Sequence, residues 1–491
     1  MDASSPTAIA KLLLPKVPLI LRTTVAHSLW LSDTSSKWDL RTEVIVKLIR
    51  SLMDPSDPST VSKAQSLSLR DSGIKGRMWI SKVTLPKPEE DSVLESLSHS
   101  FNGLKEGGEI LIDPEVRAVE AEWTGYRRGV DKNAPELDIT ESEKYTKLME
   151  EVTNGTTIFL MDPASHRPVT SQLAKLTGGR VFSVRYRLAP QQPFPAALVD
   201  ALISYLSLLY PPPNSVHAPV PASQIVFAGD SAGGGLSLCL LQFILSLHHQ
   251  SQPDSPPTML FHGHRVPVPI PAGVACSSAW ANISCSLPSY QENAKYDFLP
   301  PATSGSASKY PPCEIWPPKT GRKRQTLYAD DSCLIHPLVS PVTAPSWAGA
   351  PPILLLTGEE MLSDENDFIA RRIAATEPAE PGEAANVIIY QQYKTMPHAF
   401  AQVLPWTSGS KKCYASWASF MRDCCDEDGA ARARLKSRAS VVEPKTLQET
   451  EVEFSELARG LDMASVKEMI RAAIRRRGEG IEGEAKAMPK L

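Results

Sequence analysis

The sequence has little of what metal-binding, redox-active and nucleic-acid-binding proteins need. Its 491 residues include only eight cysteines, and no two of them form a C-x-x-C pair, so no zinc or thiol redox motif is indicated. The formal net charge is −4 and no basic stripe alternates with aromatic residues, so we expect no nucleic-acid partner. A chain of this size does not need a disulfide framework, and we expect a cytoplasmic location without metal or cofactor.

A long uninterrupted apolar run is also missing near the N-terminus. Residues 9–21 are mostly apolar, but Lys11, Pro15, Lys16 and Pro18 interrupt them. The run is shorter than the about 20 residues of a membrane-spanning helix, and no cationic segment precedes it as in a signal peptide. We expect this segment to pack over the rest of the protein, with peripheral contact to a membrane surface as the alternative.

Proline is abundant instead, with 43 residues, which predicts many loops and irregular connections. The chain is long enough for one large domain and a further layer or cap. Residues 1–128 are expected to be a mixed, helical cap region, with helical periodicity at 40–53 and loop-like composition at 85–108. Residues 426–491 are expected to be a charged tail that is partly helical, because apolar residues recur there at helical spacing.

The most informative motif is a Gly-x-Ser-x-Gly turn at residues 229–233, with Ser231 at its centre. A strand-like apolar run at 224–228 precedes it, and a long apolar run at 236–247 follows. A sharp strand-to-helix turn lifts a serine hydroxyl out of a sheet and points the next backbone N–H groups at a developing oxyanion. The pattern predicts a nucleophile elbow with the Ala232 N–H as an oxyanion donor. An ordinary glycine-rich turn is the alternative.

Other motifs accompany this turn in a collinear series. They are Tyr-Arg-Leu-Ala-Pro at 186–190, Phe-Pro-Ala-Ala at 194–197, Asp-Ser-Ala-Gly-Gly at 230–234, Ser-Ser-Ala-Trp at 277–280, His-Pro-Leu-Val-Ser-Pro at 336–341, Pro-Pro-Ile-Leu-Leu-Leu-Thr-Gly at 351–358 and Met-Pro-His-Ala-Phe at 396–400. In these motifs the chain resembles the hormone-sensitive-lipase-like family of α/β-hydrolases. The resemblance implies an α/β-hydrolase fold, with a mostly parallel, doubly wound sheet and helical lid elements. It also implies a carboxylic-ester hydrolase that acts on small esters or lipids.

The order of residues along the chain indicates the catalytic base. In α/β-hydrolases the triad follows as serine, acid and histidine. His398 lies far downstream of Ser231, just after a β-like run at 386–393, where a loop at the carboxyl edge of the sheet is expected. We predict that His398 is the base, and a histidine that only caps a loop is the alternative.

The acid follows from the resemblance and stays open among three carboxylates. The family pattern is G-x-x-D-P-L-x-D-E, and residues 362–365 match its last four positions. With a one-residue gap after Gly358, this alignment places Glu360 at the acid position. Asp364 and Glu359 are the alternative acids, and each of the three could instead be a carboxylate that favours the start of a helix.

One feature of the family is absent from the sequence. Relatives carry a His-Gly-Gly-Gly-type loop after the third strand, and its backbone N–H groups complete the oxyanion hole. Here residues 156–160 run straight into Met161, and no His-Gly-Gly run occurs anywhere. Either a gene model omits about ten residues of this motif or the protein lacks half of its oxyanion hole. His166 has no glycine partner and is expected to be an ordinary loop residue.

Two functions therefore stay open. Ser231 and His398 favour a serine esterase or lipase-like enzyme that forms an acyl-enzyme, while the missing loop favours weak turnover or a ligand-binding protein on a hydrolase scaffold, as plant gibberellin receptors are. We expect the hydrolase domain at 129–425, with a lid-like insertion at 286–332 that covers the acyl pocket together with residues 1–128. The sequence leaves the oligomeric state open.

Overall fold

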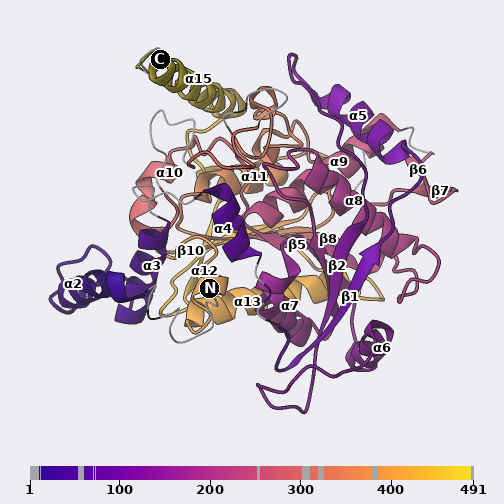
Figure 1. Cartoon of the computed structure of the whole chain (residues 1–491), viewed down its shortest axis with the longest axis horizontal. Helices are drawn as coiled ribbons and strands as arrows, with labels where there is room; N and C mark the ends of the chain where they lie inside the picture. The colour runs from indigo at the N-terminus through magenta and orange to yellow at the C-terminus, as the bar shows by residue number, and fades with distance from the viewer. Residues whose placement is uncertain are drawn as a thin grey trace.

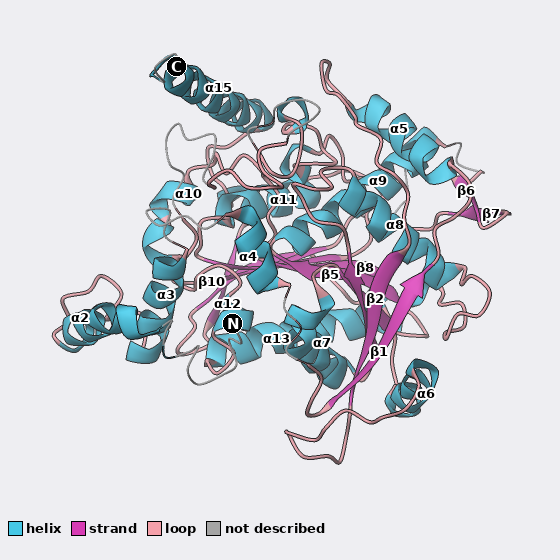
Figure 2. Cartoon of the chain, in the orientation of Figure 1, coloured by secondary structure: helices cyan, strands magenta, loops and turns pink. Residues whose placement is uncertain are grey.

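A ten-stranded sheet forms the centre of the structure, which is a computed structural model (Figures 1 and 2). It describes residues 10, 13–53, 60–69, 71, 73–251, 255–300, 310–318, 324, 326–378 and 385–487. The strands in sheet order are β1 (Met78–Leu85), β2 (Val119–Tyr126), β4 (Arg180–Arg185), β3 (Thr156–Phe159), β5 (Ile225–Asp230), β8 (Gly273–Ser277), β9 (Ile353–Gly358), β10 (Ile388–Tyr393), β11 (Arg438–Val442) and β12 (Glu449–Val452). A separate hairpin pairs β6 (Thr258–Phe261) with β7 (His264–Pro267).

Most of the large sheet is parallel. The neighbours from β4 through β3, β5, β8, β9 and β10 to β11 pair in parallel. Antiparallel pairs occur only at its two ends, where β2 pairs with β1 and β4 and where β12 pairs with β11. Parallel strands need crossover connections, which put helices on the faces of the sheet. The predicted α/β fold with a mostly parallel sheet is confirmed.

The central strands are buried on both faces. In β5, Ile225 and Phe227 join the core on one side of the sheet, whereas Val226 and Ala228 join the core on the other side. Side chains of a strand alternate between faces, so a strand that is covered on both sides needs apolar residues at every position. This requirement explains the unbroken apolar run that precedes the glycine-rich turn.

Helices form the two outer layers. On one face of the sheet lie α8, α9 and α11, and on the other lie α7 and α13 (Figure 2). The helices are α2 (Val17–Ser28), α3 (Leu40–Leu52), α4 (Val61–Ser68), α5 (Ser92–Leu104), α6 (Glu141–Glu151), α7 (Pro163–Thr177), α8 (Ala196–Leu209), α9 (Ala232–Gln250), α10 (Ser289–Glu292), α11 (Ser363–Ala374), α12 (Phe400–Val403), α13 (Ser408–Cys424), α14 (Ala430–Ala433) and α15 (Met463–Ala487). A short 3-10 helix, η1 (Leu14–Lys16), leads into α2.

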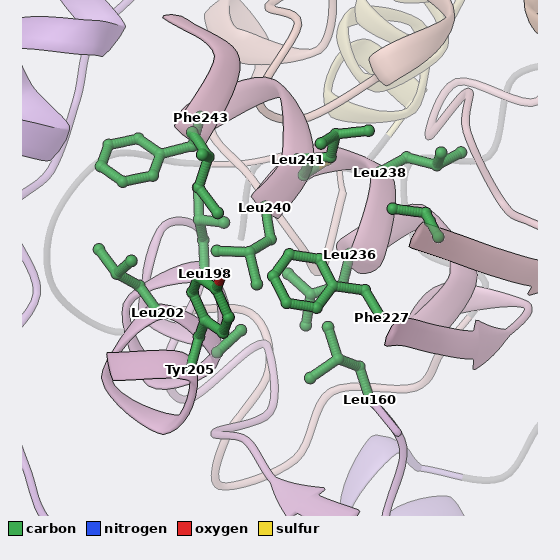
Figure 3. Close-up of a cluster of buried hydrophobic side chains, with 14 of the residues drawn as sticks. Leu160, Leu198, Leu202, Tyr205, Phe227, Leu236, Leu238, Leu240, Leu241 and Phe243 are labelled. Carbon is green, nitrogen blue, oxygen red and sulfur yellow. The ribbon is translucent and has the colours of Figure 1, made fainter. Parts of the chain in front are cut away.

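A cluster of buried apolar side chains lies between α8, α9 and the sheet (Figure 3). The ring of Tyr205 on α8 stands perpendicular to that of Phe227 on β5, with centroids 4.8 Å apart. Leu240 and Phe243 on α9 are fully buried in the same cluster. By length and composition α9 would meet the requirements for crossing a membrane, but 83% of its apolar window is buried inside the protein. Its apolar character therefore matches its place in the core.

The sheet extends beyond the expected hydrolase boundaries of 129 and 425. Strands β1 and β2 lie within the expected cap region, and β11 and β12 lie within the expected tail. These four strands pair at the two ends of the sheet. The domain boundaries remain predictions, and the flanking regions contribute strands as well as the helices expected there.

Two local predictions have different outcomes. The helix that the periodicity of residues 40–53 predicts is present as α3. The loop-like reading of residues 85–108 is wrong, because α5 occupies most of that segment. Val93, Leu97 and Phe101 stand four residues apart on α5 and are buried in the main core. Packing of this stripe stabilises a helix whose serines and flanking prolines disfavour one.

Leu240→Ala should strongly lower the free energy of unfolding, because Leu240 is fully buried between α8, α9 and the sheet. A loss of about 2–5 kcal/mol is expected for a buried leucine. The matched control is Leu52→Ala at the exposed end of α3, where 46% of the side chain is accessible and a change within about 0.5 kcal/mol is expected. Urea unfolding of both variants measures the difference, and equal losses would contradict the placement of α9.

Candidate active site

Ser231 lies between the end of β5 and the start of α9, in a strained conformation. Its φ is 51° and its ψ is −120°, in a region that residues with a side chain rarely adopt. Its N–H donates to the Ser277 carbonyl on β8 at 3.0 Å, and its carbonyl accepts from the N–H groups of Gly235 at 3.0 Å and Trp280 at 2.9 Å. The strain persists because these bonds fix the turn from both sides.

Glycine at two positions lets the chain segments of this turn approach one another. A Cβ on Gly233 would stand 1.6 Å from the carbonyl oxygen of Leu160, which follows β3. A Cβ on Gly229 would stand 2.4 Å from the backbone carbon of Gly233. No side chain fits at either distance, so these glycines are required by backbone packing. The strand, sharp turn and helix expected at residues 224–247 are all present.

Two loops bring a histidine and a carboxylate to Ser231. His398 follows β10 and Glu360 follows β9, and both strands lie in the parallel part of the sheet that contains β5. The His398 Nε2 atom is 2.8 Å from the Ser231 Oγ, and its Nδ1 is 2.8 Å from the Glu360 Oε2. The Thr357 hydroxyl donates to the other oxygen of Glu360 at 2.7 Å. The result is a continuous line of hydrogen bonds from a carboxylate to a hydroxyl.

The surroundings of His398 favour its protonated form. Both His398 and Glu360 are buried, with 4% and 0% of their surfaces exposed. Burial alone would lower the pKa of His398, but the charge and hydrogen bond of Glu360 and the nearby carboxylate of Asp297 outweigh it and raise that pKa. An imidazolium formed during a reaction would therefore be stabilised at this position.

The three candidate acids have different partners. Glu360 alone contacts His398. Glu359 accepts from the Thr395 N–H at 2.8 Å and stabilises the turn ahead of His398. Asp364 accepts from the Ser289 N–H at 2.7 Å, and burial raises its pKa. Asp364 is thus directed at the insertion between β8 and β9 and not at the histidine.

Asp297 is a residue of the candidate site that the sequence analysis missed. It belongs to the predicted insertion at 286–332, of which residues 301–309, 319–323 and 325 lie outside the described residues. It is completely buried. Its carboxylate accepts from the N–H groups of Met361 at 2.9 Å and His398 at 3.3 Å, so it joins the loop of Glu360 to the loop of the histidine. Burial raises its pKa. The only sequence signal was a lone acidic residue beside an apolar run in a segment otherwise typical of a lid.

The family resemblance implies an oxyanion loop after β3, close to Ser231. Ala232, whose N–H is the predicted oxyanion donor, is the first residue of α9. The Leu160 N–H donates to the Ala228 carbonyl at 2.9 Å, and only three residues separate the end of β3 from the start of α7 at Pro163. Asp162 caps α7 by accepting from the Ser165 N–H. The connection is short, and the Leu160 carbonyl faces the first turn of α9.

Two further histidines have places in the fold. His166, expected to be a loop residue, instead lies in α7, with its Nε2 3.4 Å from the carboxylate of Asp230, the residue before Ser231. His336 is buried and stacked on Phe101, and burial lowers its pKa to about 4. Within the described ranges, no group of three His, Cys, Asp or Glu side chains gathers as a metal site.

Comparisons with known proteins agree with this architecture. A sequence model of the alpha/beta hydrolase fold family matches residues 154–402. An acetyl-hydrolase of Streptomyces hygroscopicus is 26% identical over 275 residues, which are 56% of this chain and 75% of the relative. An esterase of Acinetobacter venetianus is 27% identical over 271 residues, 54% of this chain and 72% of the relative.

A solved structure shares the fold. The crystal structure of EstE5 soaked with p-nitrophenyl butyrate is similar with a TM-score of 0.50 and 19% identity, over 78% of this chain and 98% of that one. The family model covers just over half of the chain, including Ser231, Glu360 and His398. The chain therefore belongs to the α/β-hydrolase fold family, among hydrolases that resemble carboxylesterases and lipases.

Proposed function

We propose that this protein is a serine carboxylic-ester hydrolase that acts on small-molecule esters or lipids through an acyl-enzyme on Ser231. The hydrogen-bonded line from Glu360 through His398 to Ser231 carries this proposal. A serine hydroxyl is a weak nucleophile, and an adjacent base that is itself held by a third group is the usual means of activating it. The names of the two curated relatives, acetyl-hydrolase and esterase, support the same substrate class.

The proposed reaction has two halves. The Ser231 Oγ attacks the ester carbonyl while its proton moves to the His398 Nε2, and the tetrahedral intermediate collapses when that proton passes to the departing alcohol. Water then attacks the acyl-enzyme, gives its proton to His398, and releases the acid as the proton returns to Ser231. Glu360 orients the imidazole and stabilises its charge, and no step uses a metal or cofactor.

We assign Asp297 a positioning role in this reaction. Its contacts with the Met361 and His398 N–H groups support alignment of the acid loop with the base loop. The same contacts support the proposal that the insertion at 286–332 covers the acyl pocket as a lid within a hydrolase domain at 129–425. A cytoplasmic location is also proposed, on the ground that all eight cysteines are free thiols.

Turnover is proposed to be weak, because only one oxyanion donor is identified, the Ala232 N–H. The passage from β3 to α7 has three residues, and the Leu160 carbonyl that faces α9 is an acceptor and cannot stabilise negative charge. The same observation favours a second candidate function, a ligand-binding protein on a hydrolase scaffold. The two candidates differ in whether the nucleophile reacts.

A fluorophosphonate probe should label the protein at Ser231, because His398 can take the hydroxyl proton. Ser231→Ala and His398→Ala should each abolish labelling. His249→Ala is the matched control, since the His249 side chain is exposed and is hydrogen-bonded to the Ala348 carbonyl and not to the candidate site, and it should label like the wild type. Gel fluorescence and peptide mapping measure the result, and equal labelling of Ser231→Ala would exclude Ser231 as the nucleophile.

Glu360→Gln should lower kcat by up to about 10⁴-fold, the scale expected when a triad acid is neutralised, while Asp364→Asn should cost far less. The Glu360 carboxylate raises the pKa of His398, and the base must be neutral to act. Loss of this charge should therefore move the acid limb of the pH–labelling profile to lower pH. If Asp364→Asn has the larger effect and moves the limb, Asp364 is the acid.

Insertion of a His-Gly-Gly-Gly-type loop after Leu160 should raise the hydrolysis of p-nitrophenyl butyrate by at least about 10²-fold, since one oxyanion donor is worth about 10²–10³ in kcat. Steady-state rates of the native and loop-restored proteins measure the change, and Ser231→Ala in each background is the blank. High activity of the native chain that the loop leaves unchanged would show that another segment supplies the donors.

A further inference from the structure

Helix α2 has an apolar stripe on its solvent-facing side. Counting from the preceding 3-10 turn, exposed apolar residues recur at every third or fourth position, so they line one face. They are Leu14, Val17, Leu21, Val25 and Leu29, and the exposed Trp30 and Leu31 extend the stripe past the end of the helix. Three of them, Leu14, Trp30 and Leu31, are more than 70% exposed.

The side of α2 that faces the protein is mixed, because the half-buried Ile20 lies on the same face as Thr23 and His27. Thr23 is the buried residue of the helix, and the His27 Nδ1 lies 2.5 Å from a carboxylate oxygen of Glu43, which is completely buried on α3. Burial alone would raise the pKa of Glu43, but hydrogen bonds from Lys47, Ser32 and His27 lower it to about 2. An ordinary surface helix turns its apolar stripe inward, whereas α2 leaves this apolar stripe exposed.

Helix α2 and the 3-10 helix before it carry cationic side chains and no carboxylate, while the exposed Asp33 follows the end of the stripe. Residues 3–32 contain no Asp or Glu, whereas Lys11, Lys16 and Arg22 lie among them. Arg22 is exposed on α2 next to the stripe, and Lys16 donates to the Ser51 carbonyl at the end of α3. An apolar helix face that carries an exposed arginine and no carboxylate complements an anionic lipid surface, where acyl chains surround the apolar side chains and headgroups pair with the cation.

The position of α2 connects the stripe to the candidate active site. Figure 1 shows α2 beside α3 at the edge of the molecule, and the two helices are in contact. Arg50 on α3 donates through Nε to the Asp297 carbonyl at 2.8 Å. Trp38, just before α3, donates to the Thr395 carbonyl at 2.7 Å, in the turn ahead of His398. The helix pair is thus attached to both segments that position the histidine.

We propose that α2 docks the enzyme peripherally on an anionic lipid surface, with Leu21 and Val25 inserted among the acyl chains and Arg22 at the headgroups. This inference rests on the proposed function for its purpose, because an ester hydrolase that takes lipid substrates meets them at such a surface. The docking itself involves no hydrolysis. It is therefore measurable independently of Ser231 chemistry.

Vesicle flotation of the full chain tests the proposal, with vesicles of phosphatidylcholine alone and of phosphatidylcholine mixed with phosphatidylglycerol. The wild type should float with the mixed vesicles and more weakly with phosphatidylcholine. The double variant Leu21→Ser and Val25→Ser should bind the mixed vesicles at least about tenfold more weakly, because two apolar side chains no longer enter the lipid. Arg22→Glu should remove the preference for the anionic vesicles.

The matched control is the double variant Ile110→Ser and Ile112→Ser, which changes two exposed apolar residues that are not part of the α2 stripe and should float like the wild type. Circular dichroism of each variant shows whether the fold is kept. Absence of wild-type flotation, or equal losses in both double variants, would overturn the proposal. So would a dimer in sedimentation velocity that only the α2 variant disrupts without any lipid binding, because the stripe would then cover a second copy of the chain.

Labelling of Ser231 by the fluorophosphonate probe, in the absence of vesicles, separates this proposal from the proposed function. The α2 variant should label at the wild-type rate, since none of its changed residues touches Ser231, Glu360 or His398. Normal flotation without labelling would refute the hydrolase and keep the docking face. Labelling without flotation would refute the docking face and keep the hydrolase.

Discussion

Ser231 keeps its positive φ because β5, β8 and α9 hold its backbone from several directions. Such a conformation costs about 1–3 kcal/mol, and hydrogen bonds to Ser277, Gly235 and Trp280 maintain it. The turn also depends on Gly233, above which the Leu160 carbonyl passes too closely for any side chain. The position of the Ser231 hydroxyl relative to His398 depends on this turn. The rigidity of the buried sheet therefore determines where the hydroxyl lies.

The elements that carry this turn could be predicted from the sequence because they are buried on both faces. Strand β5 is apolar from Ile225 to Ala228 because both of its faces are covered, and the long apolar helix α9 packs on one of them. Helix α5 was not predicted, because only one stripe of it is buried and its composition is otherwise mostly polar. Its buried stripe of Val93, Leu97 and Phe101 is interrupted by serines, so its stability comes from tertiary contacts that local composition does not indicate.

The candidate site was predictable only in part, because some of its residues are brought together by contacts between segments that are far apart in the sequence. Order and spacing predict Ser231 and His398, but which of Glu359, Glu360 and Asp364 contacts the imidazole depends on the conformation of the chain after β9. That choice is made by three-dimensional contacts, in which Asp364 turns to Ser289 and Glu360 to His398. The role of Asp297 could not be predicted from the sequence, because no local sequence pattern distinguishes a buried carboxylate from a solvated one.

The carboxylate of Asp297 also has a thermodynamic consequence. It bonds the backbone of both the acid loop and the base loop, while Arg50 of the N-terminal region bonds its carbonyl. Three segments that are distant in sequence thereby share one buried group, and segments coupled in this way open together in local unfolding. Loss of the segment around Asp297 should therefore release the backbone N–H groups of Met361 and His398 together, so the order of these three segments belongs to a single conformational equilibrium.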